Sequence, residues 1–91
     1  MENIKVPEFR VKKDTEVKSL ATAIFSNITN TNKIELKCIG VPAVNQAIKA
    51  VITARGLSAP AGFDIIIKPY FESVVIEGEE KTAISMLLEK M

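Results

Sequence analysis

The sequence contains no histidine, no tryptophan and only one cysteine, and these absences exclude several kinds of chemistry. Without histidine, the chain can form no Ser-His or Cys-His nucleophile pair and no imidazole metal ligand. The single cysteine, Cys38, cannot form an internal disulfide and is too little for a thiolate metal site, as expected in a reducing compartment. The chain also has no phosphate-binding loop and no glycine-rich dinucleotide turn. We therefore expect a protein that is not an enzyme and that uses no cofactor or metal.

Glycine and proline are also scarce, with four of each, and no apolar run is long enough for a signal-peptide core or a membrane span. We therefore expect a cytoplasmic protein. With 47% hydrophobic and 25% charged residues, the composition is that of a packed globular chain and not a disordered one. A length of 91 residues suits a single domain, here residues 1–91, with one core. Because so small a domain buries a modest share of its surface, we expect a homodimer or a larger homo-oligomer.

The first part of the sequence predicts a strand, a helix and a second strand. Residues 8–13 alternate polar and apolar side chains, which is typical of a strand with one buried face. An amphipathic helix is expected next, capped by Asp14 or Thr15 at its start. The Asn- and Thr-rich residues 27–32 are expected to end this helix in a loop, because their side chains compete for backbone hydrogen bonds. Residues 34–38 alternate again and predict the second strand.

A second helix is expected between Pro42, which suits the first helical position, and Gly56, which suits a left-handed C-terminal cap. One apolar stripe along this helix is expected to face the core, and it consists of Val44, Ala47, Ile48, Val51 and Ile52.

Two further extended segments follow the second helix. Residues 63–76 read as extended, with Pro69 either interrupting the strand or lying at a sheet edge. The acidic residues 77–80 are typical of a solvated hairpin turn, although clustered carboxylates can also bind a divalent cation. Residues 82–88 suit either a closing strand or a short helix, and the preceding turn favours the strand.

The resulting order of elements is β-α-β-α-β-β, with one-sided apolarity in both helices. This order predicts an α/β two-layer sandwich in which both helices lie on one face of a mixed four-stranded sheet. The first two strands, joined through a helix, are expected to be parallel, and the last two are expected to form an antiparallel hairpin.

Several motifs resemble those of the stage V sporulation protein S family. They are GVPAVNQAIKAV at residues 40–51, TARG at 53–56, APAGFD at 59–64 and IEGEEKTAI at 76–84. They follow the order found in that family, and the resemblance covers nearly the whole chain from the first strand onward. The resemblance implies an Alba-like fold, the fold of a dimeric nucleic-acid-binding protein, and a role in regulating sporulation or related development.

The resemblance and the residue types together suggest where nucleic acid would bind. Lys12 and Lys13 at the strand-to-helix turn could hold phosphate, or could be a solvated lysine pair. Arg55 could reach a phosphate or the carbonyls of its own helix end, and Gly40 could allow a tight turn or a close backbone approach. Four side chains of the second helix could bond to phosphates or base edges, or could form an ordinary polar face: Asn45, Gln46, Lys49 and Thr53.

The charge distribution limits how strong such binding can be. The net charge is only +1, whereas avid binders neutralise many phosphates. Residues 1–60 hold nine Lys and Arg against five Asp and Glu, while residues 61–91 hold three against six. The acidic residues 77–80 depart from the basic hairpin of Alba-type proteins and would repel phosphate. We expect weak, salt-dependent binding to DNA or RNA, and the alternative is a protein-interaction module that never contacts nucleic acid.

Overall fold

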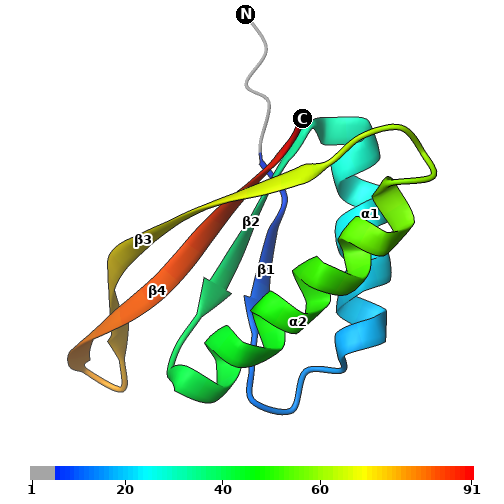
Figure 1. Cartoon of the computed structure of the whole chain (residues 1–91). Coiled ribbons are helices and arrows are strands. Elements are labelled where there is room, and N and C mark those ends of the chain that lie inside the picture. The colour runs from blue at the N-terminus through cyan, green and yellow to red at the C-terminus, as the bar shows by residue number, and fades with distance from the viewer. Residues whose placement is uncertain (1–5) are drawn as a thin grey trace, which may run out of the picture.

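The computed structural model describes residues 6–91, and in this part of the chain two helices lie over one four-stranded sheet (Figure 1). β1 is parallel to β2, and the other neighbouring strands are antiparallel, in the order β1-β2-β4-β3. Both helices cover the same face, which confirms the two-layer α/β sandwich. The elements in chain order are β1 (Glu8–Val11), α1 (Val17–Thr31), β2 (Lys33–Cys38), α2 (Val41–Ser58), β3 (Ile65–Ile76) and β4 (Glu79–Lys90).

The hydrophobic core lies between the helices and the covered face of the sheet. In β2, Ile34, Leu36 and Cys38 are fully buried, whereas Glu35 and Lys37 point to the opposite face. This alternation follows from the strand geometry, which sends successive side chains to opposite faces. The β4 residues that continue the covered layer, Met86 and Leu88, lie directly opposite Leu36 and Ile34 in the register. The other face of the sheet is therefore left open and mainly polar.

The helix α2 packs through its small residues and not through its bulky ones. Of the expected apolar stripe, Ala47 and Val51 are buried, but Ile48 and Ile52 are exposed, so this part of the prediction was wrong. The alanines are buried because small side chains let α2 approach the other helix and the sheet closely. The bulkier branched residues are then turned toward solvent. The buried residues of α2 are Ala43, Ala47, Ala50, Val51, Ala54 and Ser58.

The helix α1 continues through the segment that was expected to end it, so the predicted loop at residues 27–32 was wrong. The amide of Asn27 donates to the carbonyl of Ala23 at 2.8 Å, four residues earlier, and the neighbouring Asn and Thr side chains do the same. These bonds occupy the side chains without breaking the helix. Asn32, with a left-handed φ of 67°, then ends α1 after Thr31.

The start of α1 also differs from the prediction. Neither Asp14 nor Thr15 is the N-cap, because that position is taken by Glu16, whose side chain makes no capping bond to the backbone. The Thr15 hydroxyl instead accepts a hydrogen bond of 2.8 Å from the backbone N–H of Lys12. β1 has already ended at Val11, so the following residues form the β1–α1 turn.

The β3–β4 hairpin confirms the expectation for the last third of the chain. β3 is one of the two edge strands, so Pro69 lies at a sheet edge, where its missing N–H is tolerated. Glu77 and Gly78 both have positive φ, 51° and 79°, as a tight two-residue turn between strands requires. Ile76 pairs with Glu79 across this turn, and the final segment is a strand and not a helix.

Gly56 is not the helix cap that the sequence suggested, because α2 continues beyond it to Ser58. A Cβ added at Gly56 would meet no atom within 4 Å. The glycine that adopts a left-handed conformation after the helix is Gly62, with φ of 92°. The backbone of Gly56 is thus one that alanine adopts without strain.

We predict that Gly56→Ala raises the free energy of unfolding by about 0.5–1 kcal/mol, because alanine restricts the unfolded chain and suits a helix. The matched variant Gly62→Ala should lower it by about 1–3 kcal/mol, because its backbone is in the left-handed region. Urea unfolding followed by circular dichroism measures both. If Gly56→Ala were the more damaging variant, α2 would end where the sequence suggested.

Candidate nucleic-acid interface

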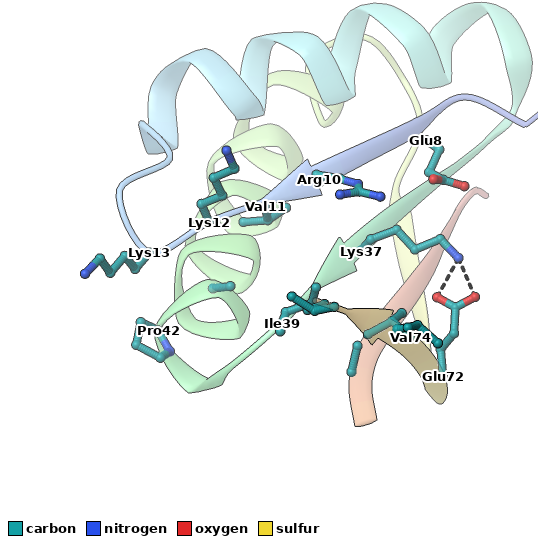
Figure 2. Close-up of a pocket in the computed structure, with 14 residues that line it drawn as sticks. Glu8, Arg10, Val11, Lys12, Lys13, Lys37, Ile39, Pro42, Glu72 and Val74 are labelled. Carbon is teal, nitrogen blue, oxygen red and sulfur yellow. Dashed lines mark hydrogen bonds and ion pairs between the residues drawn. The ribbon is translucent and has the colours of Figure 1, made fainter. Parts of the chain in front are cut away.

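Three cationic residues lie close together in the sequence where β1 ends and the β1–α1 turn begins, and their side chains point in different directions (Figure 2). Arg10 lies on the open face of β1, and Lys12 and Lys13 follow in the turn, all of them exposed. Within residues 6–91, none of the three takes part in an ion pair. We call these residues the cationic turn, and their charges are available to an anion from outside the molecule.

Hydrogen bonds hold the cationic turn against α2. The backbone N–H of Thr15 donates to the carbonyl of Lys12 at 3.1 Å, and the Thr15 hydroxyl accepts from the Lys12 N–H at 2.8 Å. The side-chain amide of Gln46 on α2 donates to the Thr15 carbonyl, also at 2.8 Å. Gln46 was predicted to contact nucleic acid, and in the structure its amide positions the turn that carries the lysines.

The other predicted residues are distributed along α2. Asn45 and Lys49 are exposed in its first half, and the Thr53 hydroxyl donates to the Lys49 carbonyl at 3.0 Å. Arg55 forms a two-bond ion pair with Asp64, at 2.8 and 3.2 Å, rather than binding the carbonyls of its helix end. This pair raises the pKa of Arg55 through the hydrogen bond with Asp64.

The structure therefore does not bring all the predicted residues together. An α-helix rises about 1.5 Å per residue, so the 18 residues of α2 span about 27 Å. Lys12 and Lys13 lie near the start of this helix, through Gln46, while Arg55 lies in its last turn. Gly40, with φ of 90°, is the N-cap of α2 and serves to turn the chain out of β2.

A cleft of about 530 Å³ opens beside the cationic turn, on the side of the hairpin (Figure 2). Its lining combines the cations of the turn with apolar residues and with one ion pair on the opposite side from Lys13. The apolar residues labelled in Figure 2 are Val11, Ile39, Pro42 and Val74.

The ion pair that lines the cleft joins Lys37 of β2 to Glu72 of β3 across β4. The Lys37 ammonium donates to both carboxylate oxygens, at 2.6 and 2.7 Å, and the Ser85 hydroxyl donates to Oε1 at 2.7 Å. The bond from Lys37, followed by that from Ser85, holds the pKa of Glu72 below its usual range. The same bond raises the pKa of Lys37. Both charges are therefore kept at neutral pH.

Several residues of this surface were missed in the sequence. Strand alternation from Glu8 through Arg10 places Arg10 on the side of the sheet next to the lysines, so its inclusion could have been predicted. The Lys37–Glu72 pair could not, because the two residues meet only through the register of the sheet. Ile39 lines the cleft only because of the path that the hairpin takes, and nothing in the sequence predicted this.

Residues 6–91 offer neither a metal-binding cluster nor a membrane-spanning helix. No group of three or more His, Cys, Asp or Glu side chains in this range is arranged to hold a metal ion. Neither of the described helices is long and apolar enough to cross a membrane.

This arrangement of helices and strands is that of the Alba fold. Alba from Thermoplasma volcanium matches with a TM-score of 0.61, over 91% of this chain and 96% of that chain, at 18% sequence identity. The family model of Stage V sporulation protein S (SpoVS) matches residues 7–91. The chain therefore belongs to the stage V sporulation protein S family, which confirms the resemblance seen in the sequence motifs.

We predict that Glu72→Gln lowers the melting temperature at neutral pH and that its difference from the parent protein shrinks in acid. Folding lowers the pKa of the Glu72 carboxyl from its ordinary value of 4.5. Such a group stabilises the folded state fully at pH values above 4.5, and this stabilisation is lost as the pH falls through the pKa of the folded state. Melting curves from neutral pH to below about 4 test this. Glu80→Gln, in the exposed hairpin, is the control. A difference that stayed constant down to acid pH would show that the ion pair contributes nothing.

Proposed function

We propose that this protein is a non-catalytic regulator, acting as a single Alba-like domain in the cytoplasm, that binds DNA or RNA weakly through the cationic turn. The observation that carries the proposal is that Arg10, Lys12 and Lys13, close together in the sequence, are all exposed and have no ion-pair partner in residues 6–91. Membership of the stage V sporulation protein S family supports a role in sporulation or related development. The Alba fold supports nucleic acid as the ligand.

The geometry of the turn suits a phosphate backbone. Lys12 and Lys13 are exposed in the turn before α1. Because the acidic residues Asp14 and Glu16 stand between them and the helix, the contact rests on the lysine side chains and not on the helix N-terminus. Asn45 and Lys49, in the first half of α2, are the exposed polar side chains best placed to extend the contact. Thr53 and Arg55 would take part only where nucleic acid extends along the helix.

The acidic hairpin tip limits both the strength and the direction of binding. Glu77, Glu79 and Glu80 are exposed there and would repel phosphate. We therefore infer that nucleic acid approaches from the cationic turn and the start of α2. With so few positive contacts, the affinity should be low and should fall as salt is added.

Exposed apolar residues supply a reason for dimer formation. Phe71 is 79% exposed and Ile52 is 63% exposed, although water solvates neither side chain well. Contiguous apolar surface of this kind marks interaction sites. We propose that a second copy of the chain covers it, and a dimer would present two cationic turns to one nucleic acid. This apolar strip consists of Val41, Val44, Ile48 and Ile52 of α2 with Phe71, Val75 and Ile84 of the hairpin.

The same strip supports the second candidate function, a protein-interaction module of the regulatory network. In that case a different protein would cover the strip, and the near-neutral net charge of +1 would reflect the absence of a nucleic-acid ligand. Salt-dependent binding to nucleic acid separates the two functions.

We predict that the protein sediments as a dimer, at twice the monomer mass of 10.0 kDa, and that Phe71→Asp converts it to a monomer. A buried carboxylate at a self-associating surface is not tolerated without a partner. Leu57→Asp, at a residue 42% exposed but outside the apolar strip, should remain dimeric. Sedimentation of the parent protein as a 10.0 kDa monomer at tens of micromolar would remove the dimer.

We predict that the protein binds unrelated DNA duplexes in low salt and that Lys13→Glu weakens all of them similarly, because phosphate contacts carry no sequence information. The logarithm of the affinity should fall with the logarithm of salt concentration by about 0.9 per phosphate contact. Fluorescence anisotropy with labelled duplexes and RNA measures both effects.

The control is Lys90→Glu, which makes the same change of charge at the far end of β4. If it weakened binding as much as Lys13→Glu, the contact would be diffuse and not located in the turn. A parent protein that bound neither DNA nor RNA in low salt would leave the protein-interaction module as the function.

A further inference from the structure

The cleft beside the cationic turn exists because the hairpin extends past the end of β2. Cys38, the last residue of β2, pairs with Ile84, so residues 79–83 of β4 pair only with β3. The hairpin bends away from the ends of β1 and β2 (Figure 1), and the cleft lies between them. Its volume of about 530 Å³ falls within the range of small-molecule sites.

One side of the cleft carries an excess of positive charge. Arg10 lies directly opposite Lys37 in the register of β1 and β2, and both side chains line the cleft. Like charges placed opposite each other destabilise a sheet. Lys37 pairs with Glu72 and Glu35, whereas Arg10 has no ion pair within residues 6–91. Glu8 is the one acidic residue of β1 in the lining, and Lys12 and Lys13 leave this side net positive. An anion bound here would relieve this repulsion.

The centre of the cleft is apolar and lined by aliphatic side chains. Ile39 is 40% exposed although it is a large hydrophobic residue, and Val74 and Pro42 lie on either side of it in Figure 2. A flat apolar group lying over Ile39 would remove this surface from water, which is favourable in proportion to the area covered.

The wall opposite Lys13 offers both a donor and an acceptor. Glu72 Oε1 accepts from Lys37 and Ser85, but Oε2 accepts only from Lys37, so it can accept another hydrogen bond. The ammonium of Lys37 has three hydrogens and can likewise bond to a second acceptor. A ligand that reached this wall would therefore bind best through a polar edge that carries both a hydrogen-bond donor and an acceptor.

We propose that the cleft binds one nucleoside phosphate unit, with the phosphate at Arg10, the base over Ile39, and the polar edge of the base at Lys37 and Glu72. Inorganic phosphate lacks the apolar body, and an aliphatic carboxylate lacks the polar edge. The unit belongs either to an unpaired strand, which rests on the proposed function, or to a free nucleotide. The occupied cleft would then make the protein prefer unpaired nucleotides to a closed duplex.

Isothermal titration calorimetry of the intact protein tests the proposal with the four common nucleoside monophosphates, inorganic phosphate and octanoate. At least one nucleotide should bind about tenfold more tightly than phosphate or octanoate. Ile39→Glu should weaken that nucleotide about tenfold, because it places a carboxylate in the cleft. Leu57→Glu, at a similarly exposed residue outside the cleft, should have no effect.

Arg10→Gln separates the charge from the apolar contact, and it should weaken the nucleotide but not the corresponding uncharged nucleoside. Circular dichroism verifies that both cleft variants fold. Equal affinity for phosphate and nucleotides, or nucleotide binding unchanged by Ile39→Glu, would overturn the proposal.

A single-stranded oligonucleotide with a terminal phosphate identifies the source of the unit. If it binds more tightly than the free nucleotide and competes with it, the ligand is an unpaired strand. If the nucleotide binds and neither the strand nor a duplex does, the cleft holds a free nucleotide and the proposed nucleic-acid function fails. Salt-dependent duplex binding without any nucleotide binding would overturn the proposal that the cleft binds a nucleotide and would leave the proposed function intact.

Discussion

The contact between the small-residue face of α2 and the elements beneath it is the constraint on which the rest of the structure depends. Ala43, Ala47, Ala50 and Ala54 are all buried, and only such short side chains let α2 lie close to α1 and the sheet. This choice of face fixes the rotation of the helix about its axis. One consequence is that Gln46 faces the β1–α1 turn and bonds to it. The other is that the bulky residues of α2 lie in the apolar strip beside the hairpin.

The two surfaces to which we assign the proposed functions follow from that rotation. The cationic turn, supported by α2, lies at the ends of the parallel strands, and the ends of neighbouring parallel strands are where α/β folds bind ligands. The apolar strip lies on the helix-covered side and is available for a second subunit. The acidic hairpin tip separates these tasks, since Glu77, Glu79 and Glu80 repel phosphate while the base of the hairpin remains apolar. A weak nucleic-acid binder with a regulatory role is consistent with this division.

The sequence predicted the elements better than their packing. Alternation and turn residues identified the strands and the hairpin, because the two-residue period and the glycine of the turn leave little choice. The buried face of α2 could not be predicted, since alanines and isoleucines form adjacent apolar stripes and periodicity does not say which is buried. For the candidate site, Lys12 and Lys13 were predicted from the turn, whereas the Lys37–Glu72 pair and the cleft depend on sheet register. The position of Arg10 on the open face of β1 could have been predicted from strand alternation.

The most direct measurement of the central claim is the footprint of a DNA duplex on the protein, recorded as changes in amide NMR signals during titration in low salt. We predict that the largest changes lie in residues 10–14 and at the start of α2, with little change at residues 77–80. Changes concentrated at the hairpin tip, or confined to the apolar strip, would contradict the claim that the cationic turn is the surface that binds nucleic acid.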